Sequence, residues 1–236
     1  MLNQFSRTEL LIGTAAMHKL QQAHVAVFGI GGVGGYVVEA LVRSGIQHLS
    51  LIDNDIVALT NLNRQIIATW DTLGKPKVEV MRSRVLSINP QADVKIHQCF
   101  FLPGNQESFD FSQYDYVVDA VDTVAAKVAL VLKAQAAGVP IISSMGAGNK
   151  LCPDMFKVAD IYKTSVDPLA RVMRQALKQH HVKHLKVVYS EEIPLKPQGA
   201  QETKGTTTHP SPGSTAFTPS AAGLLLASEV IKDLIR

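Results

Sequence analysis

The sequence predicts a doubly wound α/β fold with a mostly parallel sheet, in one domain over residues 1–236. Short apolar runs alternate along the chain with segments that have a helical pattern. The glycine-rich residues 29–35 stand between the first apolar run, residues 25–28, and the first long helical segment. The second apolar run, residues 48–52, ends at Asp53. This order of strand, glycine turn, helix and acidic strand end is typical of the first unit of a nucleotide-binding sheet.

The glycines of the first turn have separate expected roles. Gly29 permits a tight turn, Gly31 lets the backbone approach a phosphate, and Gly34 lets the following helix pack closely on the strand. Asp53 lies 24 residues after Gly29, where an acidic residue accepts hydrogen bonds from a ribose. These features alone fit a nicotinamide or flavin enzyme about as well as an ATP enzyme.

The segment after Asp53 separates these alternatives. A dehydrogenase usually turns directly into its next helix, whereas this chain continues through residues 54–77 and carries Asn61, Arg64 and Lys77 there. Fixed cations on the nucleotide side of the sheet suit a triphosphate, because its transfer needs positive charge where oxyanions develop. Together with the glycine turn and the acidic strand end, this set resembles the ubiquitin-activating-type adenylating family (ThiF, MoeB and HesA).

The resemblance implies an ATP site and roles for single residues. Arg64 and Lys77 would be catalytic, and Arg7 would join them from the other subunit of a homodimer with an isologous interface. For Arg7, an ordinary surface arginine is an equally good interpretation. The residues that the resemblance assigns to ATP are Gly29, Gly31, Gly32, Gly34, Asp53, Asp55, Asn61, Arg64, Gln65 and Lys77.

The remaining elements follow from the same patterns. Helices are predicted over residues 6–22, 36–45 and 78–88, over a segment that ends at 137, from 168 onward, and at the C-terminus to 236. The N-terminal arm, residues 1–22, would carry an apolar stripe of Leu10, Leu11, Ala15, Ala16 and Leu20. Strands are predicted over 25–28, 48–52, 94–100, 116–122, 139–144 and 158–164.

Asp122 is the candidate metal ligand. It ends the predicted strand 116–122, and open α/β sheets bind ligands at the carboxyl ends of their strands. A carboxylate there can hold Mg²⁺ on the phosphates of ATP, and the match of residues 119–123 to the family's magnesium-binding segment implies the same. A helix N-cap is the alternative role for Asp122. Asp119 stands inside the apolar run, which favours a structural role.

The second half of the chain carries a concentration of positive charge. Residues 157–190 contain seven Lys or Arg and two Asp, whereas the whole chain has a net charge of only +3. Arg171, Arg174 and Lys178 share one predicted helix, with Asp167 as its N-cap. Such a footprint suits a phosphate-backbone ligand, although basic runs are usually solvated helix faces.

Residues 160–171 and 213–223 extend the resemblance to one branch of the family, the tRNA threonylcarbamoyladenosine dehydratases. It implies that ATP activates the threonyl carboxylate of the modified adenosine, that the group then cyclises, and that tRNA is the substrate. Residues 191–215 have few large apolar side chains and are predicted to be a mobile loop. The sequence leaves open whether a monovalent cation binds and whether a sulfur-relay protein assists.

The cysteines bear on the alternatives. There are two, Cys99 and Cys152, and none follows Cys152, which disfavours thioester chemistry in the 191–215 loop and a four-cysteine zinc site. Adenylation of the C-terminus of a ubiquitin-like sulfur carrier remains the alternative function. A nicotinamide oxidoreductase is a third, but it leaves the cations after Asp53 without a role. We expect a cytoplasmic protein without a membrane span, since no apolar run is long enough.

Overall fold

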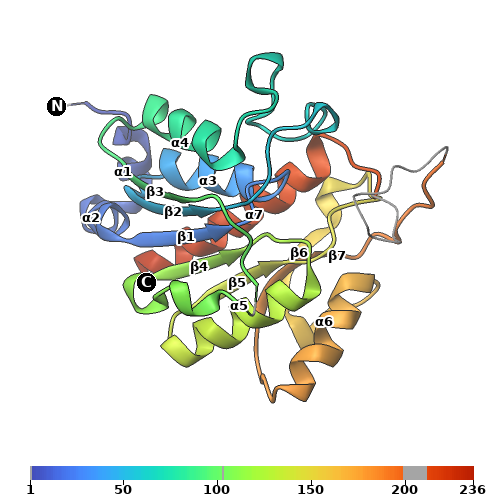
Figure 1. Cartoon of the computed structure of the whole chain (residues 1–236). Coiled ribbons are helices and arrows are strands. Elements are labelled where there is room, and N and C mark those ends of the chain that lie inside the picture. Colours follow the sequence, from blue (N-terminus) through green and yellow to red (C-terminus); the bar gives the residue numbers. More distant parts are fainter. Residues whose placement is uncertain (1, 103, 199–211) are drawn as a thin grey trace.

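A seven-stranded sheet forms the centre of the computed structural model (Figure 1). The structure describes residues 2–102, 104–198 and 212–236. The strand order is β3-β2-β1-β4-β5-β7-β6, and every neighbouring pair is parallel except β7 and β6. The strands are β1 (His24–Phe28), β2 (His48–Ile52), β3 (Asp93–His97), β4 (Tyr116–Asp119), β5 (Ile141–Ser144), β6 (Phe156–Asp160) and β7 (Lys186–Ser190). The predicted doubly wound, mostly parallel fold is confirmed.

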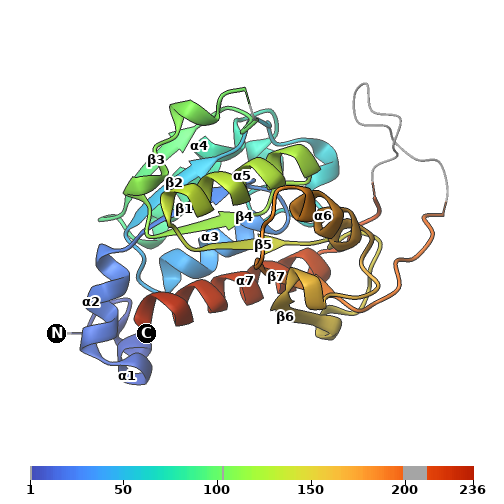
Figure 2. The ribbon, with the colours of Figure 1, turned by 90° about the horizontal axis from the view of Figure 1, so that it is seen from below.

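Helices cover both faces of this sheet. α3, α4 and α7 lie on one face, and α5 and α6 lie on the other (Figures 1 and 2). The helices are α1 (Ser6–Ile12), α2 (Thr14–Gln22), α3 (Gly34–Arg43), α4 (Lys77–Ile88), α5 (Val124–Ala137), α6 (Pro168–Gln179) and α7 (Phe217–Ile235). Short 3₁₀ turns cover Leu59–Asn61, Trp70–Thr72, Gln106–Ser108, Phe111–Gln113, Pro153–Met155 and Ile161–Lys163. No helix in the described ranges is long and apolar enough to cross a membrane.

The N-terminal arm differs from its prediction. The expected helix over residues 6–22 is two helices, because Gly13 has a φ of 83° and ends α1 before α2 begins. The expected apolar stripe is confirmed only at Leu20, since Leu10 and Leu11 are 88% and 85% exposed. The arm packs on the core through Leu20 together with Phe5 and Met17.

Five predicted strands have different ends, the first by only one residue at His24, and one strand was not predicted. The strand expected over 94–100 ends at His97, the one over 116–122 ends at Asp119, and the one over 139–144 begins at Ile141. The strand expected over 158–164 is β6, which begins at Phe156 and gives way to a 3₁₀ turn at Ile161. The missed strand is β7, whose residues Val187, Val188 and Tyr189 are buried between β5 and β6.

The N-terminus of α6 agrees with its prediction. The side chain of Asp167 accepts a hydrogen bond from the backbone N–H of Ala170 at 2.9 Å, and Pro168 occupies the first turn. Met173 and Leu177 point into a separate apolar cluster with Val182 and Leu185. The amphipathic pattern therefore fixes which side of α6 faces the protein, and its basic side chains take the other positions.

Candidate functional site

The strand order reverses between β1 and β4, and their carboxyl ends define the candidate site. Phe28 O accepts a hydrogen bond from Ala120 N at 2.8 Å, so the two chain segments leave the sheet together. Gly29 has a φ of 89°, and a Cβ atom there would lie 2.6 Å from Ala120 O. A Cβ atom at Gly34 would lie 1.7 Å from Gly29 O. Both positions therefore require glycine, for the turn and for the packing of α3.

Asp53 holds the glycine turn from the neighbouring strand. Its Oδ2 accepts from Ile30 N at 2.6 Å, and its Oδ1 accepts from Asp55 N at 2.8 Å. Burial raises the pKa of Asp53 above its usual value, and the positive charge of Lys77 partly opposes this. The carboxylate lies beside the turn, where the Rossmann-like arrangement puts an acceptor for a ribose.

Lys77 begins α4 and points back toward the same edge. Its side chain is only 5% exposed, and its Nζ lies 2.7 Å from Oδ2 of Asp55. The Asp55 side chain is 46% exposed, so one partner of this ion pair is buried and the other meets solvent. A bound anion could therefore reach Lys77 by displacing an accessible carboxylate.

Arg64 and Asn61 lie on the turn that follows Leu59. The Arg64 Nη1 donates to Thr60 O at 2.7 Å, and burial lowers the pKa of this guanidinium. The Oδ1 of buried Asn61 accepts from Ala58 N at 3.1 Å, which leaves its amide N–H groups for a ligand. A Cβ atom on Gly32 would lie 3.4 Å from Arg64 Cγ, so the arginine stem covers the glycine turn.

Gln65 provides an observation that points to a ligand. The residue is 6% exposed, and within the described part of the chain its Oε1 has no hydrogen-bond partner. Its Nε2 would lie 3.8 Å from a Cβ atom on Gly31, so the side chain faces the glycine turn. A buried amide oxygen without a donor is costly, and a bound molecule that donates a hydrogen bond would satisfy it.

Asp122 and Asp119 occupy different environments after β4. Asp119 is fully buried, lies 3.0 Å from Lys127 Nζ and accepts from Ser143 Oγ at 2.5 Å, as expected of a structural residue. Asp122 is exposed three residues beyond the strand end. No group of three or more His, Cys, Asp or Glu side chains in residues 2–102, 104–198 and 212–236 could hold a metal alone. A single carboxylate still fits Mg²⁺, which takes most of its ligands from water and phosphates.

Lys127 was missed by the sequence interpretation. It is completely buried, and besides Asp119 it binds Val121 O at 3.1 Å. It therefore fixes the backbone just before Asp122. Its position on the apolar side of a helix, next to Ala126 and Leu130, was the available signal.

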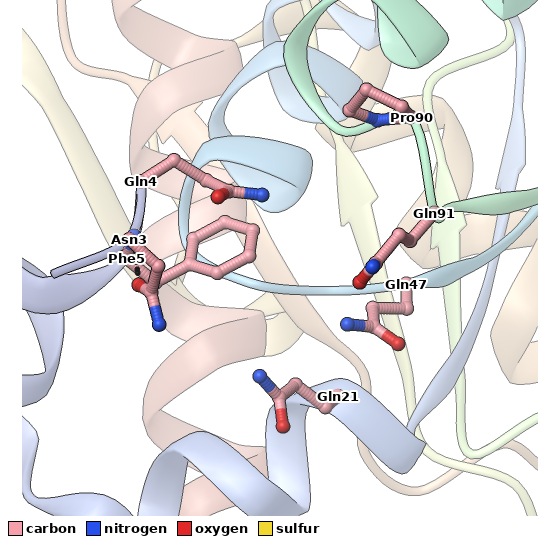
Figure 3. Close-up of a pocket in the computed structure, with 7 residues that line it drawn as sticks. All are labelled: Asn3, Gln4, Phe5, Gln21, Gln47, Pro90 and Gln91. Atoms are coloured by element: carbon pink, nitrogen blue, oxygen red, sulfur yellow. Dashed lines mark hydrogen bonds between the residues drawn. The ribbon is translucent and has the colours of Figure 1, made fainter. Parts of the chain in front are cut away.

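Arg7 does not join this group within its own chain. It is exposed on α1, and α1 lies by the amino ends of the strands, where Gln4 Nε2 donates to Asn89 Oδ1 at 3.5 Å. A cavity of about 350 Å³ lies there too (Figure 3). Its lining contains no titratable side chain and so offers no acid–base chemistry: Asn3, Gln4, Phe5, Gln21, Gln47, Pro90 and Gln91.

The predicted basic residues of α6 are not equivalent. Arg171 and Lys178 are exposed, and Lys178 Nζ lies 5.8 Å from the centroid of the Tyr162 ring. Arg174 is partly buried and donates to Thr164 O at 3.1 Å and to Thr164 Oγ1. Arg174 therefore also holds the loop before α6, whereas Arg171 is open to a partner.

The 191–215 loop is described only at its ends, because residues 199–211 lie outside the described ranges. Glu192 is buried and accepts from Leu151 N and Cys152 N, both at 2.9 Å. Burial, together with the Glu192 carboxylate, raises the pKa of the Cys152 thiol. A thiol held in its neutral form is a poor nucleophile.

Comparison with known proteins identifies the class. The ThiF family model matches residues 5–236, and the chain belongs to the ThiF family. It is 41% identical to the tRNA threonylcarbamoyladenosine dehydratase of Bacillus subtilis, in an alignment that covers 100% of this chain and 96% of that protein.

Two crystal structures of tRNA N6-threonylcarbamoyladenosine dehydratase, TcdA, from Escherichia coli are similar to it, each at 34% sequence identity. The complex with AMP has a TM-score of 0.90 and covers 98% of this chain and 94% of that one. The complex with ATP has a TM-score of 0.87, with 98% and 93% covered. These similarities confirm the resemblance to the dehydratase branch.

Proposed function

We propose that this protein is an ATP-dependent dehydratase that cyclises threonylcarbamoyladenosine in tRNA. The observation that carries the proposal is the set of side chains at the switch point. An acceptor for ribose, Asp53, lies beside a glycine turn, and the cations Arg64 and Lys77 stand on the same edge. The ATP and AMP complexes of the E. coli relative support ATP as the nucleotide.

The reaction proceeds in two steps. The threonyl carboxylate attacks the α-phosphate of ATP, which forms an acyl-adenylate and releases pyrophosphate. A nitrogen or oxygen of the same side group then attacks the acyl carbon, loses its proton and expels AMP. The carboxylate oxygen leaves with AMP, so the nucleoside loses one water in total. No protein nucleophile is needed, which agrees with the raised pKa of Cys152.

The side chains at the switch point divide the electrostatic tasks. We assign the stabilisation of negative charge at the α-phosphate to Arg64 and Lys77. Asn61 and Gln65 would form neutral hydrogen bonds with the nucleotide. Asp55 would pair with Lys77 until the phosphates of ATP replace it. Asp122 would hold Mg²⁺, which would neutralise phosphate charge when bound.

Assembly and location follow the family expectation. We propose a homodimer in which Arg7 of one subunit completes the ATP site of the other, since α1 stands exposed and away from the site of its own chain. We place the protein in the cytoplasm with its tRNA. Whether a monovalent cation binds and whether a sulfur-relay protein assists are left open by the sequence, and the proposal requires neither.

Two other functions compete with this one. Adenylation of a sulfur-carrier protein would use the same nucleotide site and differ only in its substrate. A basic exposed face on α6, with Arg171 and Lys178, favours tRNA. A nicotinamide oxidoreductase would leave Arg64 and Lys77 unused, and a cofactor titration would detect it.

The decisive experiment incubates the protein with tRNA that carries threonylcarbamoyladenosine, ATP and Mg²⁺. We expect the protein to release AMP in an amount equal to that of a nucleoside lighter by one water. Mass spectrometry of the nucleosides would measure the second product. An unchanged nucleoside, with pyrophosphate exchange only when a ubiquitin-like carrier is added, would contradict the proposal and favour the carrier alternative.

A second experiment tests the tRNA face. Replacing both Arg171 and Lys178 with Ala should weaken tRNA binding and flatten its dependence on salt, because phosphate contacts release counterions. Lys95→Ala, a change on β3 away from α6, provides the control. Equal tRNA affinity and salt dependence in all three proteins would remove α6 from the interface.

A further inference from the structure

Asn63 connects the site to a distant part of the chain. Its Oδ1 accepts a hydrogen bond from Arg64 Nη1 at 2.9 Å, and its Nδ2 donates to Ser214 O at 3.0 Å. Only a side chain that has both an acceptor and a donor can make these two contacts. The orientation of the amide is fixed by its neighbours, since a guanidinium requires the oxygen and a carbonyl requires the nitrogen.

Ser214 belongs to a segment that is itself fastened to the sheet. The next residue before it, Gly213, exchanges two hydrogen bonds with Asn149, both of 2.7 Å: Asn149 N donates to Gly213 O, and Gly213 N donates to Asn149 Oδ1. Asn149 O also accepts from Leu195 N at 2.8 Å. Asn149 therefore joins both described ends of the 191–215 segment to the turn after β5.

The backbone of Asn149 explains why this residue is suited to that position. Its φ is 58°, in the left-handed region that asparagine tolerates better than most residues. On the other side of the segment, a Cβ atom on Gly32 would lie 3.3 Å from Pro219 and 3.4 Å from Arg64 Cγ. The stem of Arg64 thus lies beside the glycine turn, and its guanidinium contacts Asn63, which in turn binds a segment from the C-terminal part of the chain.

We infer that Asn63 is a positioning residue for Arg64. It links the guanidinium to the segment of Gly213 and Ser214, which Asn149 holds in place. This inference rests on the proposed role of Arg64 toward ATP. Arg64 retains Thr60 O as an acceptor without Asn63, but one contact allows several directions of a long side chain. The second contact selects one of them.

Asn63→Ala tests the inference through ATP binding, measured by calorimetry without tRNA, and through the kcat and KM of AMP formation. We expect ATP affinity or kcat to fall about three- to tenfold, the range for one lost hydrogen bond. The melting temperature should stay close to that of the parent, because Asn63 is exposed. Asn105→Ala is the control, since the Asn105 side chain likewise accepts one hydrogen bond and donates another, although both of its partners, Leu102 N and Phe100 O, are backbone groups.

A double-mutant cycle separates positioning from an independent effect. In an Arg64→Ala background, Asn63→Ala should cause no further loss, because it acts through the arginine. Asn149→Gly keeps the left-handed backbone and removes the contact to Gly213 N, and it should give a smaller loss than Asn63→Ala. If the double variant of Arg64 and Asn63 loses more ATP affinity or kcat than Arg64→Ala alone, the inference is wrong. It is also wrong if Asn63→Ala binds ATP and turns over like the parent.

The two proposals can fail separately. If no tRNA is modified but Asn63→Ala weakens ATP binding only when Arg64 is present, the positioning role holds and the tRNA function is wrong. If tRNA is cyclised at the parent rate by Asn63→Ala, the positioning role is wrong and the function holds.

Discussion

Two buried lysine–aspartate pairs lie in different parts of the molecule, and they have different roles. Lys127 and Asp119 lie under the switch point, 3.0 Å apart and completely buried. Lys150 and Asp167 lie under α6, 3.3 Å apart and 1% or less exposed. In the first pair, Lys127 also donates to Val121 O beside the nucleotide edge. In the second pair, Asp167 also accepts from Gly146 N and caps α6.

The pair of Lys77 and Asp55 contrasts with both, because its carboxylate is half exposed. An ion pair with both partners buried can only support the fold, because neither residue can exchange its partner for a ligand. A pair with one open partner can be displaced by an anion. Burial of both partners, rather than the presence of an ion pair, thus separates scaffold from site in this protein.

The largest effect should come from breaking the first pair. Lys127→Met leaves the Asp119 carboxylate buried without its cation, and we expect a loss of about 3 to 5 kcal/mol in the free energy of unfolding. Urea denaturation would measure it. The double variant Lys127→Met with Asp119→Leu should recover much of the loss. A single variant as stable as the parent would contradict the scaffold role.

The second pair should respond less strongly. Asp167→Ala removes the contacts to Lys150 and Gly146 N and the cap of α6. We expect a loss of about 2 to 3 kcal/mol in the free energy of unfolding, less than for the first pair, because Lys150 lies in a loop whereas Lys127 lies on a packed helix. Asp167→Asn keeps a cap and is the control. If Asp167→Ala lowers the free energy of unfolding more than Lys127→Met does in the same assay, the proposed ranking of the two pairs is wrong.

The open pair should affect catalysis rather than stability. Lys77→Ala removes a charge at the site, and we expect AMP formation to slow by roughly 10² to 10³-fold, as for the loss of one preorganised donor. The free energy of unfolding should change by about 1 kcal/mol or less, because Asp55 can be hydrated. Lys75→Ala, two residues earlier, is a suitable control. A large loss in the free energy of unfolding of Lys77→Ala would show that this pair supports the fold rather than the site.

The smallest effect concerns pH. Since burial raises the pKa of Asp53 in the folded protein, the folded state binds this proton more tightly than the unfolded chain does. The contribution of Asp53 to stability therefore grows as pH falls through the folded pKa toward the unfolded value, and it is lost as pH rises. ATP affinity should change in the opposite direction, because the ionised carboxylate is the ribose acceptor.

Denaturation and ATP titrations at a series of acidic pH values would check both signs. Asp53→Asn, which does not titrate, should abolish this part of each pH dependence. A parent and variant with parallel profiles would show that Asp53 is not responsible.

The nucleotide-binding region was largely predictable because most of its signals are local. A strand, a glycine turn and a helix succeed one another within residues 24–43, and the atom that requires glycine at position 34 belongs to Gly29, five residues earlier. The Arg64 and Lys77 assignments came from the resemblance, and the structure places Arg64 on a turn and Lys77 at the start of α4, both at the expected edge.

What the sequence did not reveal depends on tertiary contacts and, in the N-terminal arm, on one backbone angle. β7 has only five residues, follows a basic run and is buried through its neighbours β5 and β6. Lys127 pairs with a carboxylate from the preceding strand, and Asn63 binds Ser214, 151 positions away. The helical pattern across Gly13 likewise could not show that one positive φ divides the arm.

The position of α7 has a consequence for synthesis of the protein. This helix is made after all seven strands, yet it packs along α3 and against β4, β5, β6 and β7. A Cβ atom on Gly223 would lie 2.4 Å from Val33 O, so α7 sits directly against the start of α3. While α7 is still inside the ribosome, the nascent chain must expose the apolar surface that Leu226 and Val230 later cover. Chaperones that shield such surfaces should therefore engage the chain before α7 emerges, and the contact that Pro219 makes beside Gly32 forms only once α7 has docked.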